Sequence, residues 1–300
     1  MRSINLIVIG DRACGTTRTY LTYLKSKGLI PSELWLVDFI PAPRITVLLR
    51  SLPFGYQIGN IFHRNVKKST SVHSSLFLKT CVELQKAVPI PIDYHSDFSY
   101  EKFAGKVIKL TVEDYSDKYL HKKILENREN AFLYTNGGIV PANILEKEDV
   151  RIFHIHPGIV PEMRGSDCFY WSLLNKGRPG ASCFYMSPGI DEGDIIGQLE
   201  FTMPKLDFLE SICTEENEDE VYRAIAFSFD PHLRAMLFAN IIEQAGDMDL
   251  RYLSTHRQES KEPYRAHLWM HQKIRFKVLK DLVQNKISQR AEKLEVARND

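Results

Sequence analysis

The first forty residues constrain the fold of this chain most, because they predict a strand, a helix and a second strand in close succession. Residues 4–9 form a short run rich in β-branched side chains that ends at Gly10, which is typical of a buried strand. Apolar side chains at helical spacing over residues 16–28 predict a helix that stops at Gly28, and residues 34–39 predict the second strand. This β-α-β order favours a parallel sheet covered by helices.

The alternation of strands and helices continues to about residue 205. Further strands are expected over residues 107–110, 131–134, 150–153, 180–187 and 195–201, and further helices over residues 118–128, after Pro141 and from residue 169. We therefore expect an α/β domain over residues 1–205, with a Rossmann-like, mostly parallel sheet and flanking helices. Beyond it, helical patterns over residues 221–245 and 269–285 predict a mainly helical C-terminal extension spanning residues 206–300.

The composition narrows the classes of protein to which this chain can belong. With 44% apolar and 26% charged residues, the chain is expected to fold into a globular protein. Its net charge of +1 gives no general attraction to nucleic acids or anionic membranes. The five cysteines form no CxxC pair, which argues against a zinc ribbon or a thioredoxin-like site. No window approaches the ~20 apolar residues of a membrane span, so we expect a soluble, cytoplasmic protein with reduced thiols.

Two histidines follow the apolar run of residues 150–153 directly. His154 and His156 stand two residues apart, and the proline and glycine residues after them cannot continue a strand. Because strand side chains alternate between faces, both imidazoles are expected on one face, at the end of a strand. The acidic segment Gly189–Asp194 predicts a second loop that meets the first. An imidazole facing a carboxylate is the basic unit of proton-transfer chemistry.

Three segments in order carry a family resemblance. Residues 136–141 (Asn-Gly-Gly-Ile-Val-Pro), 154–165 (His-Ile-His-Pro-Gly-Ile-Val-Pro-Glu-Met-Arg-Gly) and 189–194 (Gly-Ile-Asp-Glu-Gly-Asp) together resemble the folate-dependent formyltransferases. That family includes the methionyl-tRNA, glycinamide ribonucleotide and sugar-nucleotide N-formyltransferases. The resemblance is strong over about residues 105–202, continues more weakly back to residue 1 and stops near residue 205. It implies transfer of a formyl group from 10-formyltetrahydrofolate to a primary amine, on a formyltransferase core and without a metal ion.

The resemblance also implies roles for particular residues. The catalytic histidine of the family falls on His156 and its catalytic aspartate on Asp191. The chain departs from the pattern at His154, where the family has an asparagine that helps to hold the formyl oxygen. We expect a ring N–H of His154 to replace that amide as a donor to the oxyanion. The residues implied to lie against the folate are Gly137, Gly138, Ile139, Ser187, Gly189 and Ile190.

The acceptor amine is less defined by the sequence. Arg164 and Gly158 are expected to contact it, although Arg164 would equally suit a structural salt bridge. The basic residues of segment 41–70 favour either a surface connection or a loop near an anionic substrate. Residues 271–300 have a modest excess of basic residues and few aromatic residues among them, which is not the pattern of a tRNA-binding surface. We expect a small-molecule amine, such as an amino sugar nucleotide, and leave a homodimer open.

Three alternatives remain at this point. Besides a formyltransferase, the sequence is compatible with a folate-binding protein of formyltransferase-like fold without transferase activity, with a 10-formyltetrahydrofolate deformylase in which water replaces the amine, and with a metal hydrolase. The last reading is weaker than the resemblance, but His154, His156 and Asp191 would supply the three ligands of a catalytic zinc ion.

Overall fold

The computed structural model describes residues 1–11, 14–39, 74–92, 98–135, 139–259, 266–287 and 291. The basic segment 41–70 lies outside the described residues. Within this part of the chain, seven strands form one sheet in the order β3-β2-β1-β4-β5-β6-β7. The strands are β1 (Arg2–Asp11), β2 (Leu29–Phe39), β3 (Lys106–Val112), β4 (Ala131–Tyr134), β5 (Ile152–His156), β6 (Gly180–Tyr185) and β7 (Ile195–Glu200).

The first five strands are parallel, whereas β6 and β7 run antiparallel to their neighbours. The central position of β1 explains its sequence, because a parallel strand buried on both faces is apolar on both. Its residues 6–9 are fully buried. The predicted α/β class and mostly parallel sheet are therefore confirmed, and β2 begins five residues earlier than the pattern indicates.

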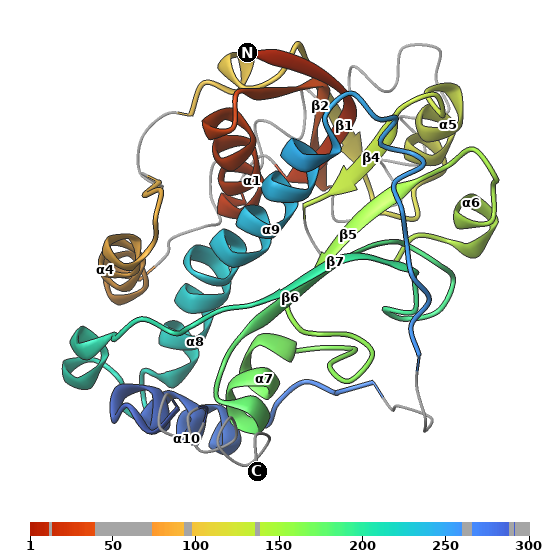
Figure 1. Cartoon of the computed structure of the whole chain (residues 1–300). Coiled ribbons are helices and arrows are strands. Elements are labelled where there is room, and N and C mark those ends of the chain that lie inside the picture. Colours follow the sequence, from red (N-terminus) through yellow and green to blue (C-terminus); the bar gives the residue numbers. More distant parts are fainter. Residues whose placement is uncertain are drawn as a thin grey trace.

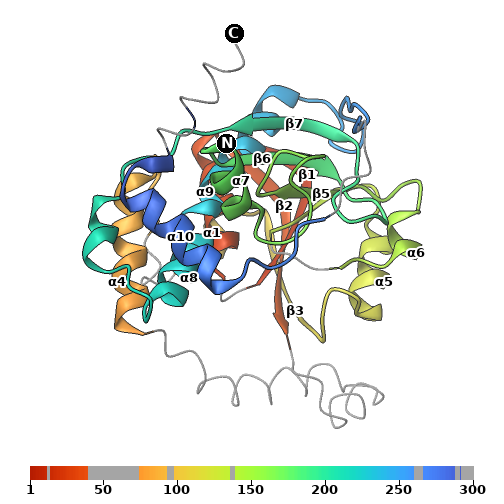
Figure 2. The same cartoon turned by 90° about the horizontal axis from the view of Figure 1, so that it is seen from below.

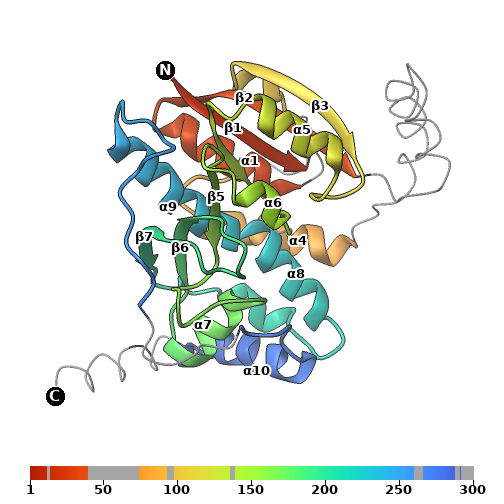
Figure 3. The ribbon, with the colours of Figure 1, turned by 90° about the vertical axis from the view of Figure 1, so that its right-hand side faces the viewer.

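Helices cover both faces of the sheet (Figures 1 and 3). Helices α1 (Gly15–Ser26) and α9 (Asp230–Ala245) lie on one face, and α5 (Lys118–Glu126) and α6 (Ala142–Leu145) lie on the other. On α9, the fully buried ring of Phe238 packs edge-on against Phe153 of β5, with centroids 5.3 Å apart. The core of the sheet thus includes a helix beyond residue 205. The division of the chain at that residue stays a prediction.

A second core lies at one end of the molecule, where four helices gather (Figure 2). They are α4 (Ser75–Leu84), α7 (Cys168–Lys176), α8 (Glu218–Ser228) and α10 (Gln272–Val283), joined by the 3₁₀ helix η4 (Asp207–Ser211). Two further 3₁₀ helices are η2 (Gln85–Ala87) and η3 (Tyr100–Lys102). The helical pattern over residues 221–245 corresponds to two helices, because α8 ends at Ser228 and α9 begins at Asp230.

The last helix begins later than its sequence pattern indicates. We expect it from Trp269, but α10 starts at Gln272, because the Nδ1 atom of His271 accepts a hydrogen bond from the backbone N–H of Lys273 and caps the helix. Trp269 lies in the extended segment before it and is largely exposed. No helix in the described part of the chain is long and apolar enough to cross a bilayer. The five cysteines are free thiols, and Cys168 and Cys183 are buried.

Candidate active site

The two histidines lie on the same face of β5. Phe153 and Ile155, which alternate with them, pack into the core beneath α1 and α9. Ile152 packs into the core on the α5 and α6 side instead. The side chains of His154 and His156 therefore point to the face opposite α9, as the two-residue period of a strand requires. His156 is almost fully buried, whereas 18% of the His154 side chain is exposed.

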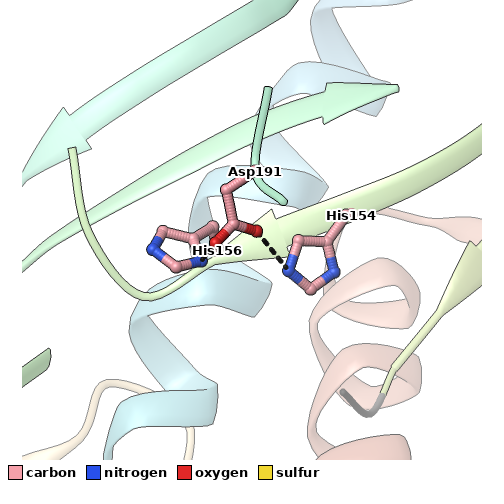
Figure 4. Close-up of side chains that lie close together, drawn as sticks. All are labelled: His154, His156 and Asp191. Atoms are coloured by element: carbon pink, nitrogen blue, oxygen red, sulfur yellow. Dashed lines mark ion pairs between the residues drawn. The ribbon is translucent and has the colours of Figure 1, made fainter. Parts of the chain in front are cut away.

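The loop between β6 and β7 brings Asp191 against both histidines (Figure 4). Oδ1 of Asp191 lies 3.7 Å from Nε2 of His154, and Oδ2 lies 3.4 Å from Nδ1 of His156. The carboxylate is mostly buried, so water screens these contacts weakly. The structure thus brings together the three residues that the sequence singles out for chemistry.

The backbone holds Asp191 in this position. Its φ of 55° lies in the left-handed region, which few residues other than glycine, asparagine and aspartate adopt. The backbone N–H of Gly165 donates to Oδ2 of Asp191 at 2.8 Å. Because Gly165 belongs to the loop after β5, this hydrogen bond joins the two predicted loops directly.

The hydrogen bonds of His156 define where its proton lies. Its Nε2 is 2.6 Å from the carbonyl oxygen of Met163. A carbonyl can only accept, so Nε2 carries a proton in every protonation state of the ring. The neutral ring therefore presents the lone pair of Nδ1 to Asp191. A proton gained at Nδ1 would be stabilised by that carboxylate.

Burial decides the charge of His154. It lowers the pKa of this ring to about 4, since the raising effect of Asp191 only partly offsets the loss of hydration and the repulsion from His156 and Arg234. Burial alone would raise the pKa of Asp191, but its interactions with His156 and His154 and the hydrogen bond from Gly165 outweigh that effect and lower the pKa to about 2. At neutral pH, a neutral imidazole therefore stands beside an ionised carboxylate.

One further residue, Gln258, joins the two loops. Its side-chain amide donates to the carbonyl oxygens of Asp191 and Gly193 at 2.9 and 2.7 Å. Its Oε1 accepts from Nε and Nη2 of Arg164 at 3.1 and 2.6 Å. The side chain of Arg164 also lies 3.4 Å from Glu192, so both of its described side-chain contacts are structural. Sequence reasoning missed Gln258, which follows Asp191 by 67 positions and belongs to no recognisable motif.

The segment before α10 pairs with the loop after β5. The backbone of His267 exchanges hydrogen bonds with Arg164 and Ser166 at 2.7 and 2.9 Å. Gly165 between them has a φ of 98°, and a Cβ atom there would lie 2.3 Å from the carbonyl oxygen of His267, so only glycine fits. In the same segment, Met270 is buried and Trp269 is exposed.

The residues expected to contact folate have mixed surroundings. Gly137 and Gly138 lie outside the described residues. Ile139 and Ile190 expose 83% and 65% of their surface, which is unusual for isoleucine. The Oγ atom of Ser187 is buried and has no hydrogen-bond partner among the described residues. Gly189 lies against the side chain of Glu192.

Gly158, expected to contact the amine, is buried within its loop. Its carbonyl oxygen accepts a hydrogen bond from Ser182 Oγ at 2.7 Å. A Cβ at this position would lie 2.7 Å from Cβ of Met163. Its visible role is close packing of the loop, and contact with a substrate stays a prediction.

The site is thus a His-His-Asp cluster under two joined loops of a mostly parallel α/β sheet. No family model matches the chain. Over 69 residues, it is 33% identical to a methionyl-tRNA formyltransferase from Syntrophus aciditrophicus (strain SB), which covers 23% of this chain and 22% of that protein. Over 72 residues, it is 29% identical to the Bacillus pumilus (strain SAFR-032) protein of the same name, covering 24% and 23%. The matches thus span less than a quarter of these relatives.

Solved structures of similar outline include a 4-N formyltransferase from Francisella tularensis, with 14% identity and a TM-score of 0.45 over 91% of this chain and 87% of that one. A phosphoribosylglycinamide formyltransferase from Streptococcus pneumoniae TIGR4 has 11% identity and a TM-score of 0.41, over 81% and 98%. The sequence matches support the assignment of this chain to the formyltransferase family.

Proposed function

We propose that this protein transfers a formyl group from 10-formyltetrahydrofolate to the primary amine of a small molecule, and that this reaction needs no metal ion. The observation that carries the proposal is the convergence of His154, His156 and Asp191 on one point of the sheet face. Nδ1 of His156 and the carboxylate of Asp191 are two hydrogen-bond acceptors that suit an amine, which must lose a proton as it attacks, and His154 lies beside them. An amino sugar carried on a nucleotide is our leading acceptor.

The buried pair of His156 and Asp191 would take the proton of the amine. As the amine nitrogen bonds to the formyl carbon, Nδ1 of His156 accepts its proton, and Asp191 stabilises the imidazolium across 3.4 Å. The bond from the formyl carbon to the folate nitrogen then breaks, and the proton passes to that nitrogen. The low pKa of Asp191 keeps it ionised throughout.

His154 would stabilise the oxyanion of the tetrahedral intermediate. A protonated His154 would repel the imidazolium of His156, but burial keeps the pKa of His154 at about 4 and the ring neutral. A neutral imidazole still has one N–H to donate. It can therefore replace the asparagine amide of the family without adding a second positive charge.

Two features fit a bound folate. The Oγ atom of Ser187, which has no partner among the described residues, offers a hydrogen bond to a polar edge of the pterin. The exposed side chains of Ile139 and Ile190 offer apolar contact to its ring. Two observations favour a small acceptor over tRNA. Helices α8, α9 and α10 pack into the two cores, and the net charge of +1 gives no general attraction to a nucleic acid. We also propose that the catalytic domain ends at residue 205 and that the protein is cytoplasmic. The proposal holds for a monomer and for a homodimer.

The test is turnover of the purified protein with 10-formyltetrahydrofolate and a panel of nucleotide-linked amino sugars, read as the formylated product by mass spectrometry. His156→Asn and Asp191→Asn should each lower kcat/KM by roughly 10²–10⁴-fold. Formate released without an acceptor would identify a deformylase instead. Folate binding without turnover across the panel would identify a binding protein.

A further inference from the structure

Three metal-ligating side chains converge in the candidate active site. One ring nitrogen of His154, one of His156 and a carboxylate oxygen of Asp191 all lie within 4.8 Å of one another. The two nitrogens are 3.7 and 3.4 Å from the nearer carboxylate oxygens. Ligands bound to a tetrahedral zinc ion at roughly 2.0–2.2 Å are about 3.3 Å apart. The cluster therefore approaches the spacing that such an ion requires and leaves a fourth position for water.

The hydrogen bonds to His156 and Asp191 resemble those that orient the ligands of a bound metal ion. Nε2–H of His156 donates to the carbonyl of Met163, which leaves the lone pair of Nδ1 pointing at the carboxylate. The N–H of Gly165 fixes Oδ2 of Asp191. Metal-bound histidines almost always donate their other ring N–H to a backbone carbonyl or carboxylate in this way. Two facing acceptors also repel each other unless a proton or a cation lies between them.

We propose that His154, His156 and Asp191 bind a divalent transition-metal ion of the zinc class, and that this ion competes with the amine for the same point. Metal binding does not depend on the proposed function, whereas the competition rests on it. His154 supplies the additional ligand that the site needs. Imidazole is a good zinc ligand, whereas the asparagine that the family resemblance implies at this position is not. The two imidazoles select against magnesium, which prefers oxygen ligands.

Calorimetric titration of the metal-free, full-length protein with zinc chloride tests the binding. We expect one ion per chain, no binding of magnesium, and an affinity for zinc at least 10-fold lower in His154→Asn and in Asp191→Asn. His271→Asn is the matched control, because His271 is exposed and asparagine also caps helices; its zinc affinity should equal that of the wild type. Four-coordinate cobalt in the same site should give an intense visible absorption that His154→Asn abolishes.

Circular dichroism of His154→Asn establishes that the variant is folded. Absence of zinc binding by the wild type, or equal affinity in the folded His154→Asn protein, would show that the metal site does not exist. In the transfer assay, zinc should raise the apparent KM for the amine and leave kcat unchanged. Zinc binding without this effect would refute the competition alone. Because calorimetry needs no substrate, its result stands even if the protein transfers no formyl group.

Discussion

Gln258 donates a hydrogen bond from Nε2 to the carbonyl oxygen of Asp191 at 2.9 Å. The same side chain accepts from Arg164, so one amide joins the loop after β5 to the loop after β6. The carboxylate that faces the two histidines is therefore positioned from a distant part of the chain. This arrangement makes the segment beyond residue 205 part of the site.

Replacing Gln258 by alanine should lower kcat by roughly 10–100-fold, since small displacements of reacting groups are costly. The substitution also removes the hydrogen bonds of Gln258 to the guanidinium of Arg164 and to the carbonyl of Asp191. Because a typical hydrogen bond contributes about 0.5–1.5 kcal/mol to the free energy of unfolding, the variant should also be less stable. Steady-state kinetics beside thermal unfolding measures both effects. Gln244→Ala, at an exposed position on α9, is the control. An unchanged kcat in Gln258→Ala would mean that the loops hold their position without it.

His154→Ala should lower kcat by about 10²–10³-fold, the usual effect of removing one oxyanion donor. His154→Asn should retain much more activity, because its amide N–H can still donate. Single-turnover measurements with 10-formyltetrahydrofolate and the acceptor compare the two variants. If His154→Ala were as active as the wild type, His154 would have no part in stabilising the oxyanion.

His232 should make the protein less stable in mild acid. This buried ring on α9 contacts the hydroxyl of Tyr23, and burial lowers its pKa from 6.5 to about 3. Below pH 6.5, His232 is protonated in the unfolded chain but stays neutral in the folded protein. The free energy of unfolding therefore falls as the pH falls toward 3. Between pH 8 and pH 5 the loss is about 2 kcal/mol, at about 1.4 kcal/mol per pH unit below 6.5.

Urea denaturation of the wild type and His232→Gln at both pH values isolates this loss. The other titrating groups are shared, so they cancel in the comparison. The variant should lose about 2 kcal/mol less than the wild type on acidification. Equal losses in the two proteins would show that His232 is protonated in the folded state.

Phe238→Ala should destabilise the protein by about 3–5 kcal/mol, because it removes a fully buried ring between α9 and the sheet. Phe227→Ala, at a half-exposed position, should cost a fraction of that. Chemical denaturation measures both. A small effect of Phe238→Ala would mean that the sheet is stable without α9, as expected for an independent domain ending at residue 205.

Local sequence patterns predict most of the elements. Every strand of the sheet falls on a predicted apolar run, because burial on a pleated surface leaves a period of two or an unbroken run. The ends of helices are predicted less accurately. The sequence pattern cannot distinguish Trp269, which is exposed before α10, from a residue inside the helix. The side chain of His271 ends the extended segment, and that contact depends on the backbone after it.

The sequence by itself determined that His154 and His156 share one face of a strand, because alternation is a property of the chain. It also carried the loops that resemble the formyltransferases. Only the tertiary structure decided that Asp191 lies against both rings, that Gln258 holds it there, and that His154 is neutral. These features join residues far apart in the sequence, or depend on burial by the whole fold, and no local pattern records either.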